Sequence, residues 1–160
     1  MRANWIRRRF ANNHWTGFGT SATEYPHVIA MDDATWLFGT TGHIGVALRG
    51  DFPDDEPMDP ASAQAAARYL ARKDGAISVA VADLKAWAGV GGWRNYREAE
   101  PEYGSVIGVH INKKVLALLL EGVTDEAVDI AASDYLTLEY YDTLVLYALD
   151  DSWRAIVAGV

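Results

Sequence analysis

Residues 40–49 read TTGHIGVALR, a polar turn followed at once by an alternating apolar segment. Gly42 can supply the positive φ that a tight turn needs, so this stretch predicts a turn that leads into a β-strand. Two further apolar runs precede it, and Asp32-Asp33 separates them. The sequence therefore predicts a meander of three short antiparallel strands, over residues 27–31, 34–40 and 43–49.

The C-terminal part of the chain repeats this pattern of apolar runs and polar turns. Turn residues occur at Ser133-Asp134, Tyr141-Asp142 and Asp150-Asp151. The run TLVLYAL (residues 143–149) is apolar on both faces, which favours a central strand or one that a partner covers. We predict a second meander with strands over residues 127–131, 136–141, 143–149 and 152–158.

Helical patterns lie at the start and in the middle of the chain. Ile6 and Phe10 have the i, i+4 spacing of a buried helix face. Asp59 can cap a helix whose first residue is Pro60, and Asn112 can cap another. The predicted helices cover residues 3–11, 61–73, 83–88 and 113–121, and the longest would carry Arg72 and Lys73 at its negative end.

The same plan, a helix followed by an antiparallel meander, occurs at both ends of the chain. The segment between them, residues 51–104, reads as an insertion with helical content, including a strand from Ile77 to Val81 and a loop over residues 90–104. A further strand is expected over residues 106–111 and a loop over 12–25. We predict a single α+β domain with halves at about 1–50 and 105–160.

The chain has 160 residues, no cysteine and a formal net charge of −8. This length is that of one ordinary domain, and disulfides and cysteine-ligated metals are excluded. No apolar run approaches the ~20 residues that span a bilayer, so no membrane partner is expected and we predict a cytoplasmic location. The N-terminal segment contains several arginines and no acidic residue, which resembles an organelle transit peptide. Import into an organelle is therefore the alternative to a cytoplasmic location.

The histidines are His14, His27, His43 and His110, and none has a metal-ligand motif around it. The acidic residues 51–59 lack the spacing of a calcium loop and suit a solvated loop with a helix cap. No nucleophile elbow or phosphate loop is present. We predict no catalytic residue, no metal and no cofactor. A small hydrolase that uses His43 and a nearby carboxylate is a further alternative.

Two groups of side chains are candidate contacts with other molecules. Lys113 and Lys114 begin a predicted helix, where two cations added to the positive end of the macrodipole suit a phosphate, although two solvated lysines fit the same pattern. Trp93, Arg94 and Tyr96 interleave aromatic and basic side chains in a loop, which suits a protein contact or a loop pinned to the core by Trp93.

TTGHIGVALR resembles the strand-turn-strand motif TDGHRLA of bacterial DNA polymerase sliding clamps. The stretch GVHINKKVLALLLEG and the strands after it resemble the second half of a clamp domain. The resemblance covers about two thirds of the chain, because residues 51–104 have no counterpart. Thr41, Ile44 and Gly45 stand where the clamp motif has Asp, Arg and Leu.

This resemblance implies a non-enzymatic DNA-replication accessory, a processivity-factor relative that forms a homo-oligomer around double-stranded DNA. Clamp helices offer cations to DNA phosphates, which implies a DNA-facing role for Arg7, Arg8, Arg9, Lys113 and Lys114. The clamp turn helps to receive short peptide motifs of replication proteins, which implies partner binding at Thr40, Thr41, Gly42, His43, Ile44 and Gly45. The alternative is a clamp-fold interaction module of phage or mobile-element type that does not encircle DNA.

Overall fold

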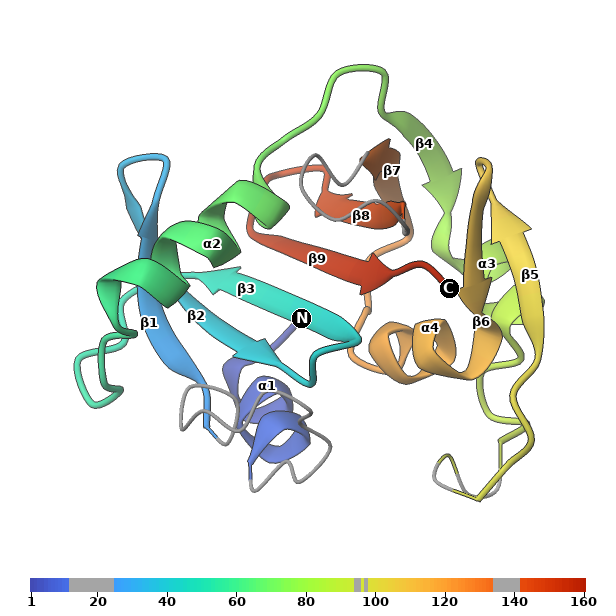
Figure 1. Ribbon diagram of the computed structural model, residues 1–160, viewed down its shortest axis with the longest axis horizontal. Helices are drawn as coiled ribbons and strands as arrows, with labels where there is room; N and C mark the ends of the chain where they lie inside the picture. The colour runs from blue at the N-terminus through green and yellow to red at the C-terminus, as the bar shows by residue number, and fades with distance from the viewer. Residues whose placement is uncertain (12–24, 94–95, 97, 134–141) are drawn as a thin grey trace.

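The computed structural model describes residues 1–11, 25–93, 96, 98–133 and 142–160. Within them the chain forms four helices, a seven-stranded antiparallel sheet and a two-stranded hairpin (Figure 1). In chain order the elements are α1 (Ala3–Phe10), β1 (His27–Met31), β2 (Ala34–Thr40), β3 (Ile44–Arg49), α2 (Pro60–Leu70), β4 (Ile77–Ala80), α3 (Val81–Ala88), β5 (Tyr103–Val106), β6 (Val109–Asn112), α4 (Lys113–Leu120), β7 (Ala127–Ser133), β8 (Thr143–Ala148) and β9 (Trp153–Ala158).

The strand order of the large sheet, β1-β2-β3-β9-β8-β7-β4, places two meanders side by side. The first meander is β1-β2-β3 and the second is β7-β8-β9. They join where the last strand of each pairs antiparallel with the other, with Ile44 opposite Val157 and Leu48 opposite Trp153. Strand β8 is buried at every residue and lies between β7 and β9, as its apolar sequence predicts.

One face of this sheet carries the main core, under α1, α3 and α4. Ile6 and Phe10 of α1 and Leu116 and Leu120 of α4 belong to the same buried cluster. The close approach of α1 depends on Gly39 of β2, because a Cβ there would lie 2.5 Å from a ring carbon of Phe10. The helix that precedes each meander therefore packs on the same face of the joined sheet.

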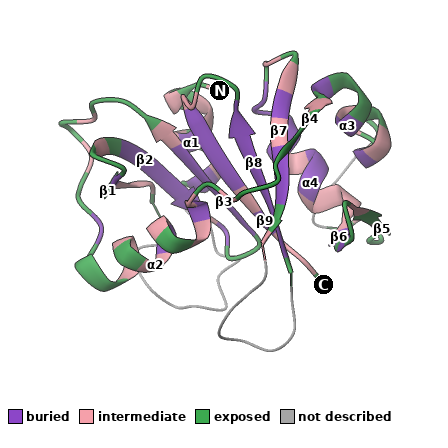
Figure 2. Cartoon of the chain, turned by 90° about the horizontal axis from the view of Figure 1, so that it is seen from above, coloured by how far each residue is buried: buried purple, intermediate pink, exposed green. Residues whose placement is uncertain are grey.

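The other face is covered in part by α2, which Figure 2 shows on the opposite side of the strands from α1 and α4. A second buried cluster forms there from β1, β2 and α2, with Trp36 and Leu70 fully enclosed. Asp59 caps α2 by accepting a hydrogen bond from the Ser62 amide, and Pro60 is its first residue. The hydrogen bond from Ser62 lowers the pKa of Asp59.

A buried arginine connects the two meanders on this second face. Arg154 of β9 donates to Asp151 at 2.9 Å and forms an ion pair with Asp32 of the β1–β2 turn at 2.7 Å. Its guanidinium also lies over the Trp36 ring and donates to the Leu70 carbonyl oxygen. Burial lowers the pKa of Arg154, but the hydrogen bonds to Asp151 and Asp32 outweigh it and raise the pKa above its usual value.

The structure confirms the predicted α+β class and the three strands of the first meander. Three predictions are wrong. The second meander was expected to place a strand at residues 136–141 between those at 127–131 and 143–149, but β7 pairs directly with β8, with Ser133 opposite Thr143. The helix expected over residues 61–73 ends at Leu70, because Arg72 turns away to contact Tyr147, Asp129 and Asp151. The strand expected over residues 106–111 is a hairpin, because residues 107 and 108 form a two-residue turn. The predicted strand 136–141 and most of the loop 12–25 lie outside the described residues.

Residues 51–104 are integrated into the fold on three sides. They supply α2 on one face, α3 on the other, and β4, which extends the sheet beyond β7. Strand β4 runs directly into α3, and β6 runs directly into α4, so the two strand-helix units repeat each other. Helices α3 and α4 pack together.

Candidate functional site

The Thr40–Gly45 turn is organised by its own hydroxyl groups. The Thr40 hydroxyl donates to the Ile44 carbonyl oxygen, and Thr41 Oγ1 accepts from the amides of His43 and Ile44. Gly42 has a φ of 88°, as the turn requires. Thr41 and Ile44 are buried, whereas the side chain of His43 is exposed. The turn is therefore a rigid structural element that presents an imidazole to solvent.

The C-terminal residues connect this turn to the β5–β6 hairpin. The Ala158 amide donates to the His43 carbonyl oxygen, and the Val160 amide donates to the His110 carbonyl oxygen. The imidazole of His110 is exposed and stacks on the Tyr103 ring. The histidine of the turn is thus held beside the end of the chain through its backbone.

The arginines of α1 differ in how far acids neutralise them. Arg7 forms an ion pair with Asp55 at 2.7 Å, which raises the pKa of Arg7. Arg9 forms one with Glu121 at 2.9 Å. Arg8 is exposed and donates to the Asn4 carbonyl oxygen. Of these three candidates, only Arg8 has no acidic partner within the described residues.

Both lysines of α4 make internal contacts. Lys113 Nζ lies 4.7 Å from the centroid of the Trp87 ring of α3. Lys114 Nζ donates to the Ala99 carbonyl oxygen at 2.7 Å. No residue of α4 itself is exposed, because α3 and the chain around Ala99 lie against it. Both lysines of the helix that the resemblance would place toward DNA are therefore half-buried and engaged in internal contacts.

The aromatic candidates lie against the core and against α4. Trp93 donates from its indole to the Ala88 carbonyl oxygen and packs on the main core. The Tyr96 hydroxyl donates to Glu121, and burial together with this bond raises the pKa of Tyr96. Arg9 forms an ion pair with the same carboxylate of Glu121. This ion pair offsets the unfavourable position of an acid at the negative end of the α4 dipole. Arg94 lies outside the described residues.

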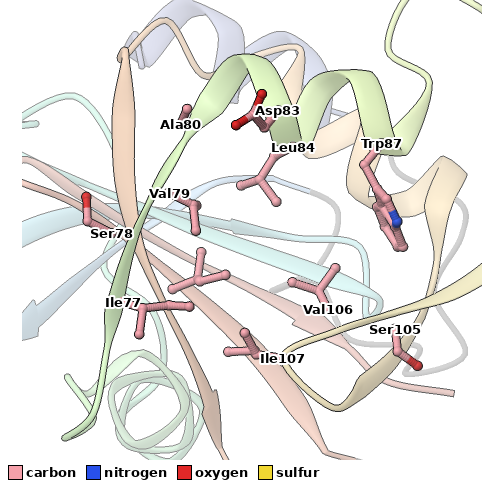
Figure 3. A pocket seen from close by; sticks show the side chains of 11 residues that line it. Ile77, Ser78, Val79, Ala80, Asp83, Leu84, Trp87, Ser105, Val106 and Ile107 are labelled. Carbon is pink, nitrogen blue, oxygen red and sulfur yellow. The ribbon is translucent and has the colours of Figure 1, made fainter.

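A groove of about 480 Å³ lies between β4, α3 and the tip of the β5–β6 hairpin (Figure 3). Apolar side chains from all three elements line it: Ile77 and Val79 of β4, Leu84 and Trp87 of α3, and Val106 and Ile107 of the hairpin. Ile77 is 49% exposed and Ile107 is 41% exposed. The groove therefore presents large apolar side chains to solvent at its rim.

The hairpin tip is held in a backbone conformation that does not suit its first residue. Ile107 has a φ of 44° and Gly108 a φ of 84°. Turns with two positive φ values favour Asn, Asp or Gly, and a β-branched residue at positive φ is an outlier. The β1–β2 turn has the same pattern with Asp32 and Asp33, which tolerate it. Ile107 is thus the strained member of two comparable turns.

Sequence reasoning did not find this groove. The dipeptide Ile107-Gly108 sits inside an apolar alternation that reads as one strand, because the usual hairpin dipeptides contain Asn or Asp before Gly. Only the glycine signals a turn. The position of β4 beside the hairpin depends on contacts between distant parts of the chain, and no local pattern encodes it.

The described residues contain no group of three or more His, Asp or Glu side chains that could hold a metal ion. Among these residues no helix has the length and apolar character needed to cross a membrane. No protein-family model matches the chain, and no curated protein or solved structure matches it. The relationship to sliding clamps stays a prediction from the sequence.

Proposed function

We propose that this chain is a non-enzymatic interaction module with a clamp-like arrangement of two halves, and that it binds protein partners without encircling DNA. The observation that carries the proposal is the covered state of α4. Its lysines contact Trp87 and the Ala99 carbonyl oxygen, and none of its residues is exposed. A phosphate that bound Lys113 or Lys114 would compete with these contacts.

The charge balance supports the same proposal. A chain of net charge −8 repels phosphates as a whole, so DNA affinity needs a concentrated basic face. Arg7 and Arg9 are neutralised by Asp55 and Glu121, which leaves Arg8 as the one cation of α1 without an acidic partner among the described residues. One isolated cation provides little counterion release.

Binding of a fluorescein-labelled DNA duplex, followed by anisotropy at low and moderate salt, tests the proposal. We expect weak binding at low salt that disappears at moderate salt. The double variant Lys113→Met, Lys114→Met keeps the aliphatic stems and should behave as the wild type in this assay. Tight binding that survives moderate salt and is lost in this variant would refute the proposal.

A DNA-replication accessory that encircles the duplex is the second candidate function. The paired meanders favour it, since α1 and α4 pack on one face of a sheet formed by two similar halves. This candidate needs a closed homo-oligomer of several copies around the duplex. It predicts that α3 moves off α4 when DNA binds, so that DNA should increase hydrogen exchange in residues 81–88.

A further inference from the structure

We propose that β4 and the neighbouring groove bind an extended peptide segment of a partner protein. The segment adds to the sheet as a strand beside β4, packs an aliphatic side chain against Ile77 and Ile107, and places a lysine or arginine near Asp83. This inference rests on the proposed function, because it names the surface and the partner chemistry through which the module acts.

The two edges of the seven-stranded sheet differ in whether their backbone groups are paired. The outer edge of β1 is occupied by the chain itself, since the Val28 amide donates to the Glu56 carbonyl oxygen and the Met58 amide donates to the Val28 carbonyl oxygen. Within the described residues β4 pairs with β7 alone. An edge strand presents unpaired N–H and C=O groups that a further strand can use.

Strand β4 is a short edge strand of four residues, but it carries none of the side chains that usually protect a free edge. Its sequence ISVA contains no proline and no charged residue, and three of its four residues are exposed. Sheet edges that must stay unpaired usually carry a lysine, a proline or a bulge. Addition of a strand from a partner is a common mode of peptide recognition, in which backbone pairing gives affinity and side-chain pockets give specificity.

The strained turn provides a second, independent observation. Ile107 adopts a positive φ, which costs conformational free energy, and it leaves 41% of its surface in water. Its side chain faces the groove together with that of Ile77 (Figure 3). An aliphatic side chain of a bound segment would remove both from water.

The charges around the groove select a basic segment. Asp83 is the ionisable residue among those that line it, and it has no ion pair within the described part of the chain. Lys85 points elsewhere and donates to the Val123 carbonyl oxygen. The ammonium of Lys113 lies over the ring of Trp87, and Trp87 is one helical turn after Asp83 in α3. The basic residue of the segment is therefore expected at the Asp83 end.

Titration of the full chain with a fluorescein-labelled peptide of alternating isoleucine and lysine tests this inference. Control peptides carry glutamate in place of lysine, or N-methyl groups on alternate amides that block strand pairing. We expect at least roughly tenfold weaker binding of both controls. Amide shifts in a ¹⁵N spectrum should concentrate in residues 77–83 and 105–107.

Protein variants locate the binding surface. Ile107→Asn suits the turn and should fold normally, yet we expect it to weaken peptide binding by about tenfold. Asp83→Asn should reduce the preference for lysine over glutamate. Tyr25→Ser removes an exposed aromatic before β1, at the opposite edge of the sheet, and should leave binding unchanged.

Three results would overturn the inference. They are no binding of the isoleucine-lysine peptide, equal binding of its N-methylated form, and equal binding by the Ile107→Asn variant. A concentration-dependent increase in mass that Ile107→Asn abolishes would assign the surface to a second copy of the chain instead. None of these results depends on DNA, so the inference can fail while the proposed function stands.

Discussion

Arg154 carries the buried charge of the described core, and its partners come from separate parts of the chain. Asp32 lies in the first meander, Leu70 ends α2, and Asp151 precedes β9. Burial of a guanidinium is tolerable only when its hydrogen bonds are satisfied. This residue therefore makes the relative position of the two meanders depend on a small set of polar contacts.

The hydrogen bonds between Arg154 and Asp151 make the stability of the fold depend on pH. Hydrogen bonds from Arg154 lower the pKa of Asp151 in the folded chain. The folded-state pKa then lies below the unfolded value of about 3.9, so the stabilisation is complete above that value and is lost as the pH falls through the folded-state pKa. Urea unfolding between neutral and acidic pH should show this loss, and Asp151→Asn should reduce it.

The double variant Asp32→Asn, Asp151→Asn extends this test. It leaves Arg154 buried without a carboxylate, which should lower the free energy of unfolding at neutral pH by about 2–4 kcal/mol. Asp33→Asn is the matched control, since Asp33 occupies the same turn and has no ion pair with Arg154. Equal stability of the double variant and the control would show that the pairing contributes nothing.

The positive φ of Ile107 predicts that a residue better suited to this conformation stabilises the fold. Asparagine adopts positive φ more readily than a β-branched residue, so Ile107→Asn should raise the free energy of unfolding by roughly 1 kcal/mol. Thermal unfolding followed by circular dichroism measures it. A destabilised variant would mean that the isoleucine stabilises the fold through contacts that outweigh its backbone strain.

At the scale of elements, residue spacing predicted most of the strands and helices. Alternation defined β1, β2 and β3, and Asn112 caps α4 as expected by accepting from the Lys114 amide. The end of α2 was missed because Arg72 leaves the helix for the Tyr147 ring and two aspartates, a tertiary effect. The hairpin turn was missed because isoleucine occupies a position at which asparagine is the usual residue in such turns.

The packing of α1 on β2 gives a prediction at this scale. A Cβ at Gly39 would lie 2.5 Å from a ring carbon of Phe10, which is fully buried. Gly39→Ala should therefore lower the free energy of unfolding by about 1–3 kcal/mol, the usual cost of overpacking. Gly75→Ala is unsuitable as a control because of its positive φ, whereas Gly92→Ala would place its Cβ 3.3 Å from the Gly89 carbonyl oxygen, the one close atom among the described residues. Urea unfolding that gives equal stabilities for Gly39→Ala and Gly92→Ala would contradict this packing.

At the scale of the whole molecule, the joined meanders account for the repeated plan that the sequence shows at both ends. The pairing of β3 with β9 depends on contacts across more than half the chain, so local patterns could not place it. The same limit applied to the candidate site. Sequence identified the cations and aromatics as chemical types, but only the fold shows that Arg9 and Tyr96 meet Glu121 and that α3 covers α4.

The absolute mass in solution, measured by light scattering with and without duplex DNA at moderate salt, tests whether the chain encircles DNA. An interaction module that does not encircle DNA should show the mass of a small assembly, one or two chains, that duplex DNA does not change. A closed assembly of roughly six chains that takes up the duplex would contradict the claim and identify a ring around DNA.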